Sequence, residues 1–158
     1  MENNFQMVAK TLFGFEDLLA NELTQLGAQK VKKGVRNVTF YGDKGFMYKC
    51  NLALRTAIKI LKPIASFKVV NEADLYDKIY NIKWEDYVDY KGTIAINSTV
   101  HSTVFTHSQY ISLKAKDAIV DRFRAVKGER PSIDLKFPDL KINIHIDKLF
   151  CNVSLDSS

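Results

Sequence analysis

The chain has 158 residues, of which 46% are hydrophobic and 26% charged, and its formal net charge is +5. These values fit one ordinary globular domain or two small ones, and they exclude a disordered or fibrous protein. Apolar runs are interrupted by lysine or proline well before the ~20 residues that a membrane helix needs, and the N-terminus lacks a signal-peptide pattern. We therefore expect a cytoplasmic protein with no membrane partner.

The first segments read as a strand followed by a helix. The sequence "FQMVAKTLF" at 5–13 has the length of a strand, and "GFEDLLANELTQLGA" at 14–28 has the period of an amphipathic helix ending at Gly27. The predicted apolar side of that helix consists of Phe15, Leu18, Leu19, Leu23 and Leu26.

Two strands, a helix and a further strand complete the first half. The sequence at 29–42 predicts two strands that turn at Lys33-Gly34, and the next helix begins after Asp43. The strand at 56–69 contains Pro63, which predicts an edge strand or a bulge. The order β-α-β-β-α-β is the ferredoxin-like plan.

The second half is also of mixed α and β character. A helix is predicted at 72–82, a half-exposed strand at 92–102 and one or two strands at 140–155. No linker rich in proline, glycine or serine separates the halves. We therefore expect a ferredoxin-like subdomain at 1–68 packed tightly on a second α/β subdomain at 69–158.

A long helix precedes the last strands. It is predicted to start at about Ser108 or Tyr110 and to end at Lys127-Gly128. Five residues share its predicted inward side, namely Ala115, Ala118, Ile119, Phe123 and Val126. On the opposite side, Lys116, Arg124 and Lys127 surround Val120.

The charges of this helix have two interpretations. Asp117 and Asp121 lie at helical spacing from Arg124, as in a solvated helix face with weak salt bridges. Alternatively, Lys114 and Arg130 extend the basic side into a surface that holds phosphate. Spacing alone leaves both interpretations open.

Other polar and aromatic residues are assigned structural roles. Arg122 lies at the edge of the apolar side, and we expect it to be partly buried and paired with a carboxylate such as Asp134. Four aromatic residues are interpreted as packing between the subdomains rather than as a stacking platform: Tyr76, Tyr80, Trp84 and Tyr87.

Basic residues also concentrate near the start of the chain. Residues 1–65 hold ten Lys/Arg against five Asp/Glu, which indicates an anionic partner. The predicted hairpin "KVKKGVR" presents Lys30, Lys32, Lys33 and Arg36, either as a second phosphate contact or as a charged edge that keeps the sheet soluble.

Cysteine and histidine are few and scattered. Cys50 and Cys151 have no second thiol or histidine at zinc-site spacing, and we expect both to be reduced and buried. The histidines have no serine or cysteine nucleophile in a recognisable setting. The sequence predicts no metal site and no catalytic residue.

Several segments resemble a known family. "FGFEDLLANELTQLGA", "LRTAIKILKPI", "LYDKIYNIKWEDYV" and above all "KAKDAIVDRFRAVKGERPSID" are similar to the N-terminal part of THUMP-containing methyltransferases. In particular they resemble the bacterial 23S ribosomal RNA guanine-N2 methyltransferases, whose members are often labelled N6-adenine-specific DNA methylases. The resemblance implies a ferredoxin-like subdomain joined to a THUMP RNA-binding domain at 69–158.

The resemblance also implies which part of the enzyme this is. The family's C-terminal domain binds S-adenosylmethionine through a glycine-rich loop and uses an Asn/Asp-Pro-Pro-aromatic motif. None of the seven glycines here forms G-x-G, and the three prolines are never adjacent. We therefore expect these 158 residues to be no enzyme and to bind no cofactor, with S-adenosylmethionine held by a methyltransferase domain that follows.

With the resemblance included, the function expected is RNA binding, with 23S ribosomal RNA and the chain's own methyltransferase domain as partners. Basic side chains neutralise phosphates, and exposed aromatic rings stack on unpaired bases. The residues expected to contact RNA are His107, Gln109, Tyr110, Lys114, Lys116, Arg124, Lys127, Arg130, Lys32, Lys33 and Arg36. The alternatives are a module that docks on the catalytic domain and the THUMP region of a transfer-RNA-modifying enzyme.

Overall fold

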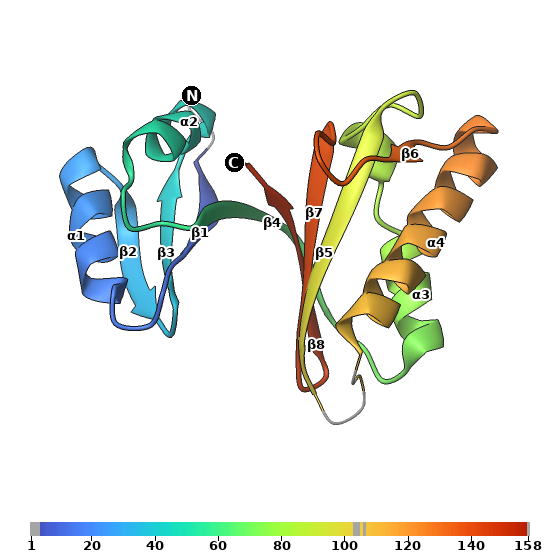
Figure 1. The fold of residues 1–158 in the computed structure, drawn as a ribbon, viewed down its shortest axis with the longest axis horizontal. Helices are drawn as coiled ribbons and strands as arrows, with labels where there is room; N and C mark the ends of the chain where they lie inside the picture. Colours follow the sequence, from blue (N-terminus) through green and yellow to red (C-terminus); the bar gives the residue numbers. More distant parts are fainter. Residues whose placement is uncertain (1–3, 103–104, 106, 158) are drawn as a thin grey trace. The chain divides into compact units, whose positions relative to one another are not determined.

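The computed structural model describes residues 4–102, 105 and 107–157. The chain forms two compact units (Figure 1). Unit 1 consists of Met1–Pro63 with Asp156–Ser158, and unit 2 consists of Ile64–Leu155. Strand β4, Lys59–Lys68, begins in unit 1 and continues into unit 2. Each unit combines helices with strands, as the sequence predicts.

Unit 1 has the ferredoxin-like order of elements. They are β1 (Phe5–Lys10), α1 (Glu16–Leu26), β2 (Gln29–Gly34), β3 (Asn37–Gly42), α2 (Lys44–Ala53) and the first part of β4. The strands follow one another in the sheet as β2-β3-β1-β4, with antiparallel neighbours. Both helices cover one face, where Leu19 and Leu23 of α1 and Met47 of α2 pack on Met7 and Phe40 of the sheet.

Local signals explain where the helices of unit 1 begin and end. The Asp43 carboxylate accepts a hydrogen bond from the Phe46 N–H at 2.7 Å, which caps α2. Gly27 ends α1 with a φ of 106°, in the left-handed region that favours glycine. Phe15 and Leu18, predicted on the apolar side of α1, are instead 41% and 52% exposed. Phe15 lies outside the regular helix, at its N-cap.

One prediction for the strands of unit 1 is wrong, and of the two alternatives for Pro63 the edge strand is excluded while the bulge stays a prediction. The hairpin turns at 35–36 instead of Lys33-Gly34, because β2 stays paired with β3 through Gly34. Pro63 does not mark an edge strand, since β4 lies between β1 and β8 in the strand order. The pairing of β4 with β1 ends at Leu61, so the missing N–H of Pro63 costs that ladder no hydrogen bond.

Unit 2 places two helices on one face of its sheet (Figure 1). Its elements after β4 are α3 (Glu72–Tyr80), η1 (Trp84–Asp86), β5 (Thr93–His101), α4 (Ser108–Lys127), β6 (Ser132–Ile133), β7 (Leu140–Asp147) and β8 (Phe150–Asp156). The strand order is β4-β8-β7-β5-β6, and β5 runs parallel to both β6 and β7. Ile142, Ile144 and Ile146 of β7 are buried in one cluster with Leu75 and Ile79 of α3.

The long helix α4 is buried on more than one side. Ala118, Ile119 and Phe123 are buried as predicted, whereas Val126 is 49% exposed. Val120, placed by the sequence at the centre of the solvent-facing side, is only 4% exposed. The reason is the chain after α4, which turns back and pairs β6 with β5, so that this edge of the helix is covered as well. Within the described residues, no helix is both long and apolar enough to span a membrane.

Candidate nucleic-acid interface

A groove lies beside the first half of α4. Its volume is about 630 Å³. It is lined by Ile96, Asn97 and Ser98 of β5, by Ser108, Gln109, Ser112, Leu113 and Lys116 of α4, and by Ile133 and Leu135 after the helix. The walls therefore combine aliphatic side chains with two amides, three hydroxyl groups and one ammonium group. This combination suits a flat, partly apolar ligand that carries negative charge.

Hydrogen bonds fix α4 against β5 at this groove. The Ser98 Oγ donates to the Ser108 carbonyl at 2.5 Å and lies 2.5 Å from the Ser112 Oγ. Gln109 and Lys116 are seven residues apart and lie on the same side of the helix, two turns from each other. Neither side chain has a hydrogen-bond or ion-pair partner among the described residues, so both polar ends are available to a ligand.

The predicted nucleotide contacts His107, Gln109 and Tyr110 lie together at the start of α4. With Ser108 and Leu113 they line a second hollow of about 500 Å³. His107, Gln109 and Tyr110 are all exposed. The second hollow shares Gln109 with the groove, so of these three residues Gln109 lies at one site with Lys116.

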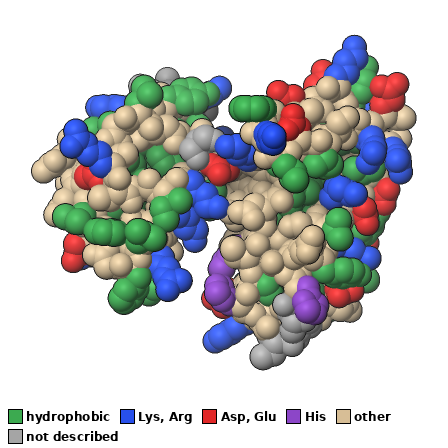
Figure 2. All heavy atoms as spheres, viewed as in Figure 1, with side chains coloured by type: hydrophobic (Ala, Val, Ile, Leu, Met, Phe, Trp, Pro, Cys, Tyr) green, Lys and Arg blue, Asp and Glu red, His purple; other side chains and the backbone are tan. Residues whose placement is uncertain are grey.

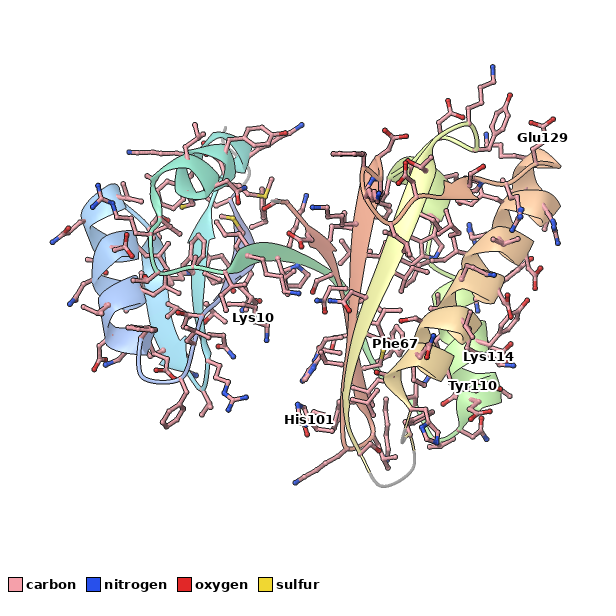
Figure 3. All side chains as sticks on the ribbon, in the orientation of Figure 1. Lys10, Phe67, His101, Tyr110, Lys114 and Glu129 are labelled. Carbon is pink, nitrogen blue, oxygen red and sulfur yellow. The ribbon has the colours of Figure 1, made fainter. Side chains whose placement is uncertain are left out.

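Lys114 lies on the side of α4 that faces α3. Its ammonium group is 6.0 Å from the centre of the Tyr76 ring, a cation–π distance. The Tyr76 hydroxyl donates to the Asp121 carboxylate, and this bond raises the pKa of Tyr76 to about 12. Figure 3 labels Lys114 together with Tyr110 on the same part of α4. Lys114 thus contributes to a surface different from that of Lys116.

Arg122 is a structural residue, as the sequence predicts, but its partner is Glu85 rather than Asp134. The Arg122 Nε and Nη2 donate to the two Glu85 carboxylate oxygens at 2.8 and 2.7 Å, and Nη1 donates to the Tyr80 carbonyl at 2.9 Å. The Arg122 guanidinium holds the pKa of Glu85 at about 2. Asp134 instead accepts from the backbone N–H of Lys136.

The basic residues near the end of α4 do not join those of the groove. Lys127 lines a hollow of about 450 Å³ together with Glu85, Asp86 and Asp89, whose carboxylates oppose the binding of phosphate. The predicted pairing of Arg124 with Asp117 and Asp121 does not occur among the described residues. On the face of unit 2 drawn in Figure 2, basic and acidic side chains are interspersed. Arg124 and Arg130 are exposed.

The remaining predicted contacts belong to unit 1. Lys33 forms an ion pair with Asp17 at 2.5 Å, so its charge is partly matched. The backbone N–H of Arg36 donates to the Glu16 carboxylate at 2.9 Å, which fixes the hairpin turn and leaves the guanidinium in solvent. Lys32 is exposed and pairs in register with Thr39.

Sequence reasoning missed an exposed apolar segment after α4. Leu135 is 79% exposed and Phe137 is 83% exposed, with Lys136 between them. Leu135 also lines the groove. The sequence does contain a signal for this segment, namely the run Leu-Lys-Phe between Pro131 and Pro138. Apolar residues in such a short loop follow neither a helical nor a strand period, so they are not expected to be buried in a core.

Aromatic residues and thiols are structural. The prediction that four aromatic residues pack between the subdomains is corrected: Trp84 is fully buried in the core of unit 2, Tyr76 and Tyr80 pack against that same core, and Tyr87 is 40% exposed. Both cysteines are free and buried as predicted, and burial raises the pKa of Cys50 to about 11 and of Cys151 to about 12. In the described part of the chain, no group of three His, Cys, Asp or Glu side chains is placed to hold a metal ion.

Comparison with known families accounts for both units. Residues 69–156 match the THUMP domain, and residues 6–61 match the RlmL ferredoxin-like domain. The chain therefore belongs to the THUMP-domain family, with a ferredoxin-like domain before the THUMP domain. This confirms the family resemblance seen in the sequence.

Two relatives show the context in which this pair of domains occurs. The chain is 41% identical over 145 residues to a candidate RNA methyltransferase of Synechocystis sp., covering 92% of this chain and 38% of the relative. It is 39% identical over 145 residues to the ribosomal RNA large subunit methyltransferase K/L of Syntrophotalea carbinolica, covering 92% of this chain and 20% of that protein. The chain thus spans less than two-fifths of the length of either relative.

Solved structures share the fold. A predicted N6-adenine-specific DNA methylase from Listeria monocytogenes superposes with a TM-score of 0.82 at 23% identity, covering 98% of this chain and 40% of that one. TrmN from Thermus thermophilus superposes with a TM-score of 0.70 at 17% identity, covering 99% and 46%. The same arrangement of elements therefore occurs in other, longer chains.

Proposed function

We propose that this chain is an RNA-binding module that positions ribosomal RNA, 23S ribosomal RNA in particular, for a guanine-N2 methyltransferase domain in the same polypeptide. The observation that carries the proposal is the groove of the THUMP domain, where Lys116 and Gln109 line an apolar hollow. The names of the relatives support the choice of ribosomal RNA. A 4-thiouridine synthetase solved as a complex with RNA also shares the fold, with a TM-score of 0.59 at 14% identity.

The groove has the properties that an unpaired nucleotide requires. Its volume of about 630 Å³ falls within the range of small-ligand sites. Proteins that recognise RNA bind splayed-out bases against apolar or aromatic side chains and read the base edges with hydrogen bonds. Ile96, Leu113 and Ile133 provide the apolar walls, Gln109 both donates and accepts, and Lys116 neutralises a phosphate.

In this proposal the chain contributes to methylation only by positioning the RNA. Contacts distant from the reacting atoms hold one target nucleotide near the catalytic domain, which replaces a bimolecular search by an intramolecular one. The methyltransferase domain would bind S-adenosylmethionine and supply the catalytic residues. No residue of these 158 takes part in methyl transfer under this proposal.

A second candidate is a module that docks on its own catalytic domain. The observation that favours it is the exposed pair Leu135 and Phe137, since large apolar side chains in solvent mark interaction surfaces. The two candidates respond differently to salt. RNA binding weakens steeply as salt increases, whereas apolar docking does not.

The test uses a charge reversal at the groove. In Lys116→Glu, the affinity for a labelled single-stranded fragment of 23S ribosomal RNA should fall about tenfold or more at ~50 mM salt, because an attractive contact becomes a repulsive one. Lys83→Glu is the matched control, an exposed lysine of unit 2 outside the residues that line the groove. Fluorescence anisotropy over a salt series measures both variants.

Equal losses in the two variants would mean that only net charge matters and would refute a specific role for the groove. No measurable RNA binding by the parent chain at low salt would refute the proposed function itself. Tighter binding to transfer RNA than to the ribosomal fragment would redirect the proposal to a transfer-RNA-modifying enzyme.

A further inference from the structure

The first four strands of the chain carry positive charge without any negative charge in their unit 1 residues, and Asp156 at the end of β8 is the acidic strand residue of that unit. The strands β1, β2 and β3 and residues 59–63 of β4 contain six lysines and no aspartate or glutamate. Unit 1 as a whole has ten Lys/Arg against six Asp/Glu, whereas unit 2 has thirteen against twelve. The excess charge of the chain therefore lies in the ferredoxin-like unit, and the THUMP unit is nearly neutral.

The register of the sheet decides which of these lysines share a face. Met7 and Ala9 of β1 and Ile60 of β4 pack in the core beneath α1 and α2. Side chains alternate along a strand, so Lys10 and Lys59 point to the opposite face. Figure 3 shows Lys10 across the sheet from α1. The face not covered by the helices is called the open face below.

The open face is basic and polar. Lys10 lies directly opposite Asn37 on one side and Lys59 on the other. Lys32 shares the same face, because it lies opposite Thr39, which in turn lies opposite Val8. At the edge of the sheet, the Lys30 ammonium group is 5.2 Å from the centre of the Tyr41 ring. Among the neutral members of the face, Gln6, Asn37, Thr39 and Tyr41 carry hydrogen-bonding groups, whereas Val8 and Leu61 are apolar.

Lys10 and Lys59 repel each other in the folded protein. Like charges directly opposite on antiparallel strands destabilise the pair. Burial lowers the pKa of Lys10, and the charge of Lys59 lowers it further. Neither lysine has a carboxylate partner among the described residues. A bound anionic group would offset both the burial and the repulsion.

We propose that the open face of unit 1, centred on Lys10, Lys59 and Lys32, binds the phosphate backbone of RNA as a contact separate from the groove of the THUMP domain. This inference rests on the proposed function for the identity of the polyanion. Lysines contact phosphates without reading sequence, and neutral polar groups add hydrogen bonds to phosphate and sugar. The open face therefore anchors the strand, and the groove receives one nucleotide.

The experiment compares two double variants of equal charge. Lys10→Gln with Lys59→Gln removes the centre of the open face, and Lys44→Gln with Lys49→Gln removes two exposed lysines from α2, an element packed on the other face. The first variant should bind the labelled single-stranded RNA about tenfold or more weakly at ~50 mM salt, and its slope of log K against log salt should flatten by about 1.4, or ~0.7 for each lost contact. The α2 variant should retain the parent slope.

Folding is checked in the same variants. Replacing Lys10 and Lys59 removes a like-charge contact, so the thermal midpoint should stay the same or rise. Should the double variant unfold, the single Lys59→Gln variant carries the test, with an expected flattening of the slope by about 0.7.

The outcomes separate this inference from the proposed function. If Lys116→Glu weakens RNA binding while the Lys10/Lys59 variant binds with the parent salt slope, the open face does not contact RNA, and the proposed role of the groove is supported. If RNA binding weakens only in the Lys10/Lys59 variant, the open face is supported as an RNA contact, and the proposed role of the groove is refuted. Equal slopes for the Lys10/Lys59 and α2 variants overturn the inference, as does lysine-dependent binding of anionic phospholipid vesicles without any effect on RNA.

Discussion

The ion pair that fixes α4 gives a sharp test of the structure. Arg122→Met removes two charge-assisted hydrogen bonds to Glu85 and one to the Tyr80 carbonyl. The two side chains are 14% and 19% exposed, so water compensates only partly for the lost partner. Breaking a fully buried pair costs about 3 to 5 kcal/mol, and we expect about 2 to 3 kcal/mol here. For a chain of this length the thermal midpoint should fall by about 4 to 12 °C.

The stability that the same ion pair gives the parent chain should decrease at low pH. The folded-state pKa of Glu85, about 2, lies below the ~4.3 of an unperturbed glutamate. The ionised Glu85 therefore stabilises the folded state at pH values above its unfolded-state pKa. This contribution to the free energy of unfolding is lost as the pH falls from about 5 towards 2. Glu85→Gln should flatten this part of the pH dependence.

Urea unfolding at pH 7 and at several pH values below 5 measures both effects, with Lys83→Met as the surface control. The reasoning is refuted if Arg122→Met changes the free energy of unfolding by less than ~0.5 kcal/mol, the range of ordinary surface substitutions. It is also refuted if the parent and Glu85→Gln lose the same stability between pH 5 and pH 2. Arg122→Lys should destabilise the chain yet keep the parent salt slope for RNA, which separates an anchoring role from a binding role.

Two further predictions concern the core. Phe123→Ala should lower the free energy of unfolding in urea by about 3 to 5 kcal/mol, because Phe123 is 1% exposed in the core of unit 2. Leu113→Ala, at a 51% exposed position, should lower it by less than ~1 kcal/mol. Similar losses in the two variants would contradict the packing of α4. Cys50 and Cys151 should not react with a thiol reagent at pH 7 until urea unfolds the chain, because burial raises the pKa of both thiols. Stoichiometric labelling of the native protein would show that the thiols are not buried.

The sequence by itself determined the order of the elements and the ends of some helices. Asp43 and Gly27 act within one or two turns of their own helices, so the start of α2 and the end of α1 are readable from local signals. Ile142, Ile144 and Ile146 show the period of a strand that is buried on one face. The ferredoxin-like plan of unit 1 and the family resemblance follow from such local and linear patterns.

The tertiary structure decided which surfaces are free. A helical wheel assumes one buried side, but the return of β6 beside β5 covers a second side of α4 and buries Val120. The same return brings Ile133 and Leu135 next to Lys116 and forms the groove. No local pattern predicts this, because the residues that meet are separated by the whole second half of the helix.

Partners distant in sequence were likewise decided by the fold. Arg122 pairs with Glu85, 37 residues before it, because its side of α4 packs against η1. The Asp134 carboxylate instead accepts from the backbone N–H of Lys136. Lys10 faces Lys59 only because β1 and β4 are neighbours in this register, and a shift by one residue would move one of them to the helix side. Charge composition is a property of the sequence, whereas the meeting of two like charges on one open face depends on strand register.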